Sequence, residues 1–129
     1  MTNNHTAIDK TGVSLSALCI VHCLAGPALL AIYPATHSLA NETLFHTVFA
    51  PILLGIAALA FYRGYRKHGK AAILGLGISG ISFLVLGILF HDHMLTGLVS
   101  AQVVLSVFGS ILLIWAHVWN IRSCRCEHA

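Results

Sequence analysis

The chain has 129 residues, of which 57% are hydrophobic and only 9% are charged, and its mean hydropathy is +0.85. A soluble domain carries about 25% charged residues, so this composition excludes an ordinary soluble domain and indicates a membrane protein. The formal net charge is +3, from seven bases and four acids. The bases are spaced as membrane-flanking residues, so we expect no nucleic-acid partner and a bilayer as the surroundings.

The few charged residues divide the sequence into long uncharged stretches. A membrane-spanning helix needs about 20 mainly apolar residues, and each stretch supplies enough. Long runs of leucine, isoleucine and alanine favour helices over the alternating pattern of a barrel. We predict an all-α fold, a four-helix transmembrane bundle that forms a single domain over residues 1–129, with spans at about 13–33, 43–62, 71–91 and 97–119 and a tail at 120–129.

A cleaved signal peptide is the rival interpretation of the first span, because Ser38–Ala40 could mimic a cleavage site. The apolar run is too long for a signal peptide, and residues 1–12 lack a positive n-region. We therefore expect the first span to be retained.

The basic residues predict the orientation. Lys10 precedes the first span, four bases lie between the second and third spans, and Arg122 and Arg125 follow the fourth. All seven bases then fall on one side of the membrane, which the positive-inside rule makes the cytoplasm. We expect a multi-pass protein of the inner (plasma) membrane with both termini cytoplasmic (N-in and C-in).

The stretch CIVHC, residues 19–23, is the most informative part of the first span. On a helix Cys19 and Cys23 are one turn apart and share a face, and His22 lies beside that face. The same face is continued by the small residues Gly12, Ser16 and Gly26. One cysteine packs as a small hydrophobe, but a histidine in a membrane span is a functional hypothesis by default. We predict metal binding by Cys19, His22 and Cys23, with packing as the alternative.

The two loops on the other side of the membrane are rich in imidazoles and carboxylates. These groups suit divalent cations, so we predict an outer entry vestibule, with solvated loop histidines as the alternative. The vestibule residues are His37, His46, His91, Asp92 and His93.

The third span is rich in glycine. Its glycine-rich face could pack within one chain or against a second copy in a homo-oligomer.

A mostly polar helical face recurs along the fourth span, at Gln102, Ser106, Gly109, Ser110, Leu113, His117, Asn120 and Cys124. Such a face often holds membrane helices together, but here it leads to a tail with Cys124 and Cys126 as CxC, followed by His128. Thiols and imidazoles are ligands for soft metals. We predict metal binding by His117, Cys124, Cys126 and His128, with two incidental tail cysteines as the alternative.

These groups form a gradient of ligands across the membrane. Imidazoles and carboxylates lie outside, cysteine and histidine within the membrane, and two cysteines inside. Softer ligands bind soft ions more tightly, so a thiophilic cation would be passed inward by ligand exchange. The chain has no Walker motif, phosphate-binding glycine loop or hydrolase-like triad. We expect a carrier that is not an enzyme and has no permanent cofactor.

The DKTG stretch at 9–12, the cysteine-bearing first span, the four helices and the basic, cysteine-containing tail resemble the MerC family of mercury-transport membrane proteins. The resemblance covers about residues 8–128. It implies a four-helix inner-membrane protein that takes Hg²⁺ across the membrane for cytoplasmic reduction or sequestration.

The resemblance also implies roles for the cysteines. Cys19 and Cys23 would receive the ion, and Cys124 and Cys126 would take it on the inner side and pass it to a cytoplasmic acceptor. The first span of the mercury-resistance members carries a motif that resembles CxxC. This chain instead has CxxxC, with His22 before the second cysteine. An added imidazole suits Zn²⁺, Cu⁺ or Fe²⁺ better than Hg²⁺.

Two other functions remain open from the residues. A membrane thiol–disulfide oxidoreductase would use the two cysteine pairs. Such an enzyme is expected to carry one pair at the outer face of the membrane, where this chain has no cysteine. A haem-binding bundle would use His22 and His117 as axial ligands, although their expected depths in the membrane differ.

Overall fold

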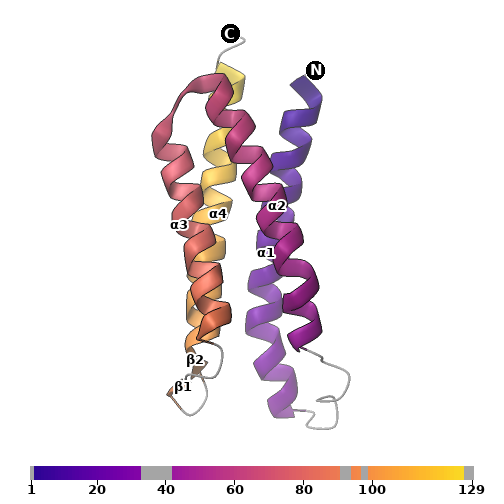
Figure 1. The fold of residues 1–129 in the computed structure, drawn as a ribbon. Coiled ribbons are helices and arrows are strands. Elements are labelled where there is room, and N and C mark those ends of the chain that lie inside the picture. The colour runs from indigo at the N-terminus through magenta and orange to yellow at the C-terminus, as the bar shows by residue number, and fades with distance from the viewer. Residues whose placement is uncertain (1, 33–41, 91–93, 97–98, 127–129) are drawn as a thin grey trace.

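The structure is a computed structural model that describes residues 2–32, 42–90, 94–96 and 99–126. It contains the helices α1 (Thr2–Ile32), α2 (Glu42–His68), α3 (Ala71–Leu89) and α4 (Ala101–Cys126), with the short strands β1 (Met94–Thr96) and β2 (Val99–Ser100) before α4. Consecutive helices run in opposite directions along a common bundle axis (Figure 1). The predicted all-α, four-helix architecture is confirmed.

Three helices are long and apolar enough to cross a membrane. Among the described residues these stretches are Thr6–Gly26, Ala71–Leu89 and Ala101–Cys124. Large apolar side chains cover the outside of the bundle; Val21 is 60% exposed and Trp115 is 63% exposed. A surface of this kind needs an apolar surrounding, which the hydrocarbon of a bilayer provides. The span predicted at 43–62 falls within α2, and its crossing stays a prediction.

The first helix begins earlier than the predicted span. The sequence places the start of the span at residue 13, whereas α1 begins at Thr2. The preceding residues are part of the bundle, because Asp9 and Gly12 are buried in it. The carboxylate of Asp9 bonds to α4, and this contact attaches the polar N-terminal turns to the bundle.

The ends of the last two helices also differ from the prediction. α3 ends at Leu89 rather than 91, and α4 begins at Ala101 rather than 97, because β1 and β2 form an antiparallel pair just before it. At its other end α4 continues to Cys126, so residues 120–126 are helical and not a tail. A side-chain bond supports this extension, because the Lys70 ammonium donates to the Ser123 hydroxyl at 3.1 Å.

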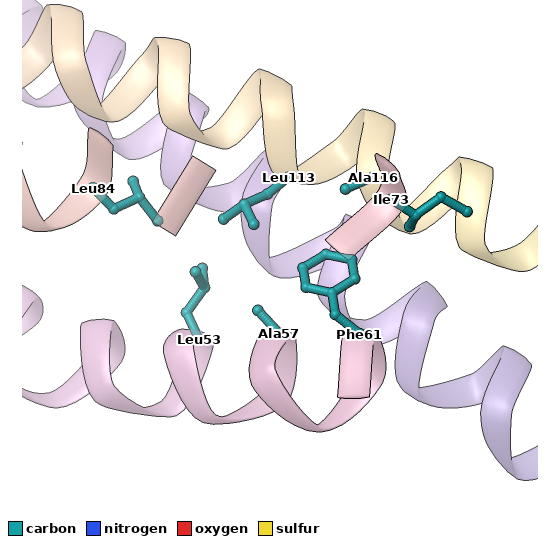
Figure 2. Packing of buried hydrophobic residues seen from close by; sticks show 7 residues of the cluster. All are labelled: Leu53, Ala57, Phe61, Ile73, Leu84, Leu113 and Ala116. Atoms are coloured by element: carbon teal, nitrogen blue, oxygen red, sulfur yellow. The ribbon is translucent and has the colours of Figure 1, made fainter. Parts of the chain in front are cut away.

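The apolar core lies between α2, α3 and α4. Figure 2 shows side chains of α2 pointing toward those of α3 and α4 in one cluster, which consists of Leu53, Ala57, Phe61, Ile73, Leu84, Leu113 and Ala116. Glycines bring α3 and α4 together: a methyl group at Gly109 would lie 2.8 Å from the carbonyl oxygen of Gly80. Gly77, Gly80 and Gly87 all meet side chains or backbone of the same chain, so these three glycines of α3 pack within one chain.

Both termini and the α2–α3 connection lie at one end of the bundle (Figure 1). The connection turns at Gly69, whose φ of 65° favours glycine, and whose N–H donates to the carbonyl of Tyr65 at 2.8 Å. The elements at this end carry the described basic side chains, Lys10, Arg63, Arg66, Lys67, Lys70 and Arg122. The bundle therefore gathers its bases at one end, as the spacing predicts.

Candidate functional site

Two cysteines lie on the face of α1 that packs against α4. Cys23 is 6% exposed, and the half-buried Cys19 packs against the core cluster. The two cysteine side chains interact with each other, and Cys19 also contacts Ser110 of α4. Neither cysteine is in a disulfide. Gly12 and Ser16 are buried on the same face, so the shared face predicted from the spacing is confirmed.

His22 is half-buried beside this pair. Within the part of the chain that the structure describes, no three His, Cys, Asp or Glu side chains lie close enough together to hold a metal ion. The arrangement around Cys19 and Cys23 is thus a pair of sulfurs rather than a triad with the imidazole. Metal binding by Cys19, His22 and Cys23 stays a prediction.

A second polar site lies toward the end of the bundle that carries the termini. Nδ1 of His117 donates to Oδ1 of Asp9 at 2.8 Å, and Nδ2 of Asn120 donates to Oδ2 of the same carboxylate at 2.9 Å. The three residues are only 1–2% exposed. A buried carboxylate is tolerated when its oxygens are paired in this way. Asp9 therefore joins α1 to α4 through both of its oxygens.

The network continues from α4 to α2. Nδ2 of Asn120 also reaches the carbonyl oxygen of Ala60 at 3.4 Å, and its Oδ1 accepts from Nε2 of His68 at 2.8 Å. Nδ1 of His68 accepts from the backbone N–H of Lys70 at 3.0 Å. These roles are mutually consistent with a neutral His68 that carries its proton on Nε2. Gly64 makes the contact possible, because any side chain there would overlap the Asn120 amide.

The ring of His117 is enclosed on several sides. It stacks on Phe61, with ring centroids 4.6 Å apart and an interplanar angle of 29°, and its Nε2 lies over Gly12. Ser110, the residue of α4 that contacts Cys19, lies about 10 Å from His117 along the helix axis. The structure places His117 with Asp9 and not with the cysteines. This enclosure also leaves little room for the axial haem ligation that the sequence left open.

Several predicted site residues have side chains outside the described part of the structure. His37, His91, Asp92, His93 and His128 lie outside the described residues, and the side chains of His46 in α2 and Cys126 in α4 are not described. Cys124 is half-buried in the last turns of α4. The outer vestibule and the inner cysteine pair therefore stay predictions.

The sequence interpretation missed the network as a unit. Asn120 was placed correctly on the polar face of α4, but Asp9 was seen only as part of a motif, and His68 was not singled out. Asp9 carried a usable signal, because an ionisable residue at the edge of a membrane span needs a partner. The partner could not be identified, since His117 is 108 residues away.

The family model described as MerC mercury resistance protein matches residues 9–122. This range covers most of the chain, so the protein belongs to the MerC family, as the resemblance of its motifs predicts. It includes Cys19, Cys23 and the whole Asp9–His117–Asn120–His68 network, whereas Cys124 and Cys126 lie just beyond it. No curated protein and no solved structure matches the chain.

Proposed function

We propose that this MerC-family protein carries Hg²⁺, or a comparably soft ion, across the inner membrane into the cytoplasm. The observation that carries the proposal is the sulfur pair of Cys19 and Cys23, packed between α1 and α4 within the membrane-spanning stretch Thr6–Gly26. Two sulfurs suit Hg²⁺, which prefers two linear thiolates. Structural Zn²⁺ takes four ligands, and the described residues offer no third ligand of the usual kind at this point.

The chemical step is ligand exchange. As the ion arrives, its bonds to outer ligands break, two metal–sulfur bonds form with Cys19 and Cys23, and the two thiol protons leave to bulk water. Thiolates are softer ligands than imidazoles and carboxylates and bind a soft ion more tightly. Exchange from the predicted vestibule to the sulfur pair is therefore favourable without an external energy source.

The inner half of the path uses the predicted pair Cys124 and Cys126. Positions two apart on a helix point about 200° apart around its axis, so chelation of one ion by both would require the last turn of α4 to unwind. Cys124 also lies about 21 Å beyond Ser110 along α4. We infer that the transfer needs either a movement of the helices or a small thiol as intermediate, followed by a cytoplasmic acceptor.

The orientation in this proposal rests on the basic residues. With the termini and the bases at one end of the bundle, the positive-inside rule puts that end in the cytoplasm. Import then runs from the β1–β2 end of the bundle toward the Asp9 network. Reactivity of the tail cysteines with a membrane-impermeant maleimide in intact cells would contradict this orientation.

The test is titration of the purified protein in detergent with Hg²⁺, Cu⁺, Zn²⁺ and Fe²⁺, for the wild type and Cys19→Ser/Cys23→Ser. We expect tight Hg²⁺ binding that the double variant loses. Ser79→Ala is the matched control, because the Ser79 hydroxyl is satisfied by its own helix through the carbonyl of Leu76. Binding of none of the ions, or unchanged binding in the double variant, would contradict the proposal. A stable Cys19–Cys23 disulfide in cells would favour the oxidoreductase instead.

A further inference from the structure

Two buried serines flank the sulfur pair. Ser110 of α4 is 0% exposed and contacts the side chain of Cys19, and Ser16 of α1, 1% exposed, lies one turn before Cys19 on the same face. The hydroxyl oxygens of Ser16 and Ser110 are fully buried, and neither makes a hydrogen bond of good geometry. Buried hydroxyls are normally satisfied, so these two require an explanation.

Three other hydroxyls of the helices show the ordinary solution. In a helix, a serine or threonine usually donates to a carbonyl one turn earlier. Ser79 donates to Leu76 at 2.8 Å, Ser82 to Ile78 at 2.9 Å, and Thr11 to Ala7 at 3.0 Å. Ser16 and Ser110 do not use this partner. Both residues are buried, Ser16 on the α1 face that carries the cysteines and Ser110 in contact with Cys19.

A hydroxyl group can donate a hydrogen bond to a sulfur ligand that carries negative charge. A thiolate bound to a metal retains lone pairs that accept hydrogen bonds, and these bonds orient the ligand and tune its affinity for the metal. In the apolar interior of a membrane bundle no water supplies such donors. A hydroxyl without another partner is therefore suited to this task.

We propose that Ser110 is a positioning residue of the ion site: its hydroxyl donates a hydrogen bond to the sulfur of Cys19 when the ion is bound. The inference rests on the proposed function and deepens it, because it makes the site interhelical. The two sulfur ligands come from α1 and the donor from α4. Binding of the ion thereby strengthens the contact between these two helices.

The sharpest test replaces the hydroxyl by a thiol. In a Cys23→Ser/Cys124→Ser/Cys126→Ser background the remaining cysteine is Cys19. With Ser110→Cys added, Hg²⁺ should again bind two protein sulfurs, those at positions 19 and 110, as counted by X-ray absorption at the mercury edge in thiol-free detergent. Ser79→Cys in the same background is the matched control and should leave the count at one, because position 79 is on α3, away from Cys19.

A second variant tests the hydrogen bond itself. Ser110→Ala should lower the affinity for Hg²⁺ about tenfold, the lower limit for loss of an outer partner of a metal ligand, as measured by competition with a dithiol buffer. Ser79→Ala should have the affinity of the wild type. One protein sulfur in the Ser110→Cys variant, or an unchanged affinity in Ser110→Ala, would overturn the inference, while Hg²⁺ binding by the wild type would leave the proposed function standing. If the wild type itself does not bind Hg²⁺, both the inference about Ser110 and the proposed function are overturned.

Discussion

Nδ1 of His117 lies 2.8 Å from Oδ1 of Asp9, and the two residues are separated by 108 positions in the chain. The bond links the first helix to the last near the end of the bundle that carries both termini (Figure 1). Asn120 bonds the second oxygen of the carboxylate, and His68 links Asn120 to the C-terminal end of α2. One buried carboxylate thus organises contacts among three helices.

Asp9→Ala should destabilise the bundle strongly. The substitution leaves the Nδ1 of His117 and one amide hydrogen of Asn120 buried with fewer partners, and breaking a buried pair costs about 3–5 kcal/mol. The free energy of unfolding in mixed detergent micelles measures the loss. Lys10→Ala, next to Asp9 but with an exposed side chain, is the control and should change the value by less than about 0.5 kcal/mol. Equal stabilities for the two variants would show that the network does not hold the helices together.

Gly12→Ala should disturb the same network at the ring of His117. A methyl group at position 12 would overlap the imidazole of His117, so either the ring or the helix must shift. Overpacking of this kind costs about 1–3 kcal/mol. Gly75→Ala on α3 is the matched control, because a methyl group there meets nothing within 4 Å. We expect a lower thermal midpoint for Gly12→Ala only; a midpoint like that of the control would mean that α1 is not packed as closely on α4 as described.

Gly109→Ala should separate α3 from α4. The added methyl would lie 2.8 Å from the carbonyl oxygen of Gly80 and 3.1 Å from the backbone nitrogen of Leu84, and backbone atoms cannot turn away as a flexible side chain can. We expect a loss of about 1–3 kcal/mol, measured as above. Gly55→Ala, at an open position of α2, should be close to neutral. The prediction fails if both variants unfold alike.

Cys124→Ser/Cys126→Ser should separate binding from delivery. The proposed receiving pair is intact in this variant, so the purified protein should still bind Hg²⁺ at Cys19 and Cys23. Uptake of ²⁰³Hg²⁺ into cells that express the variant should fall toward the level of cells without the protein. Cys23→Ser should abolish both binding and uptake while the helical content by circular dichroism is unchanged. Normal uptake by the tail variant would remove Cys124 and Cys126 from the path.

The number of helices, their approximate positions and the gathering of the bases at one end could be predicted from the sequence. A bilayer restricts the choice of fold, since an apolar run of about 20 residues must satisfy its backbone as a helix. The positions of Cys19 and Cys23 on one face followed from the helical repeat alone. The ends of the helices could not be predicted as well, because α1 and α4 extend into polar sequence that no hydropathy pattern marks as helical.

The sequence by itself determined what is local: the membrane class of the protein, the faces of its helices and its family. Only the tertiary structure decided which faces meet. It paired His117 with Asp9 rather than with the cysteines, and it brought the hydroxyl of Ser110 to Cys19. Helical periodicity states which residues of one helix lie together, but the partner on another helix depends on the register and rotation of both. Those are set by close contacts such as Gly12 against His117 and Gly109 against Gly80, which arise from the packing of the whole bundle.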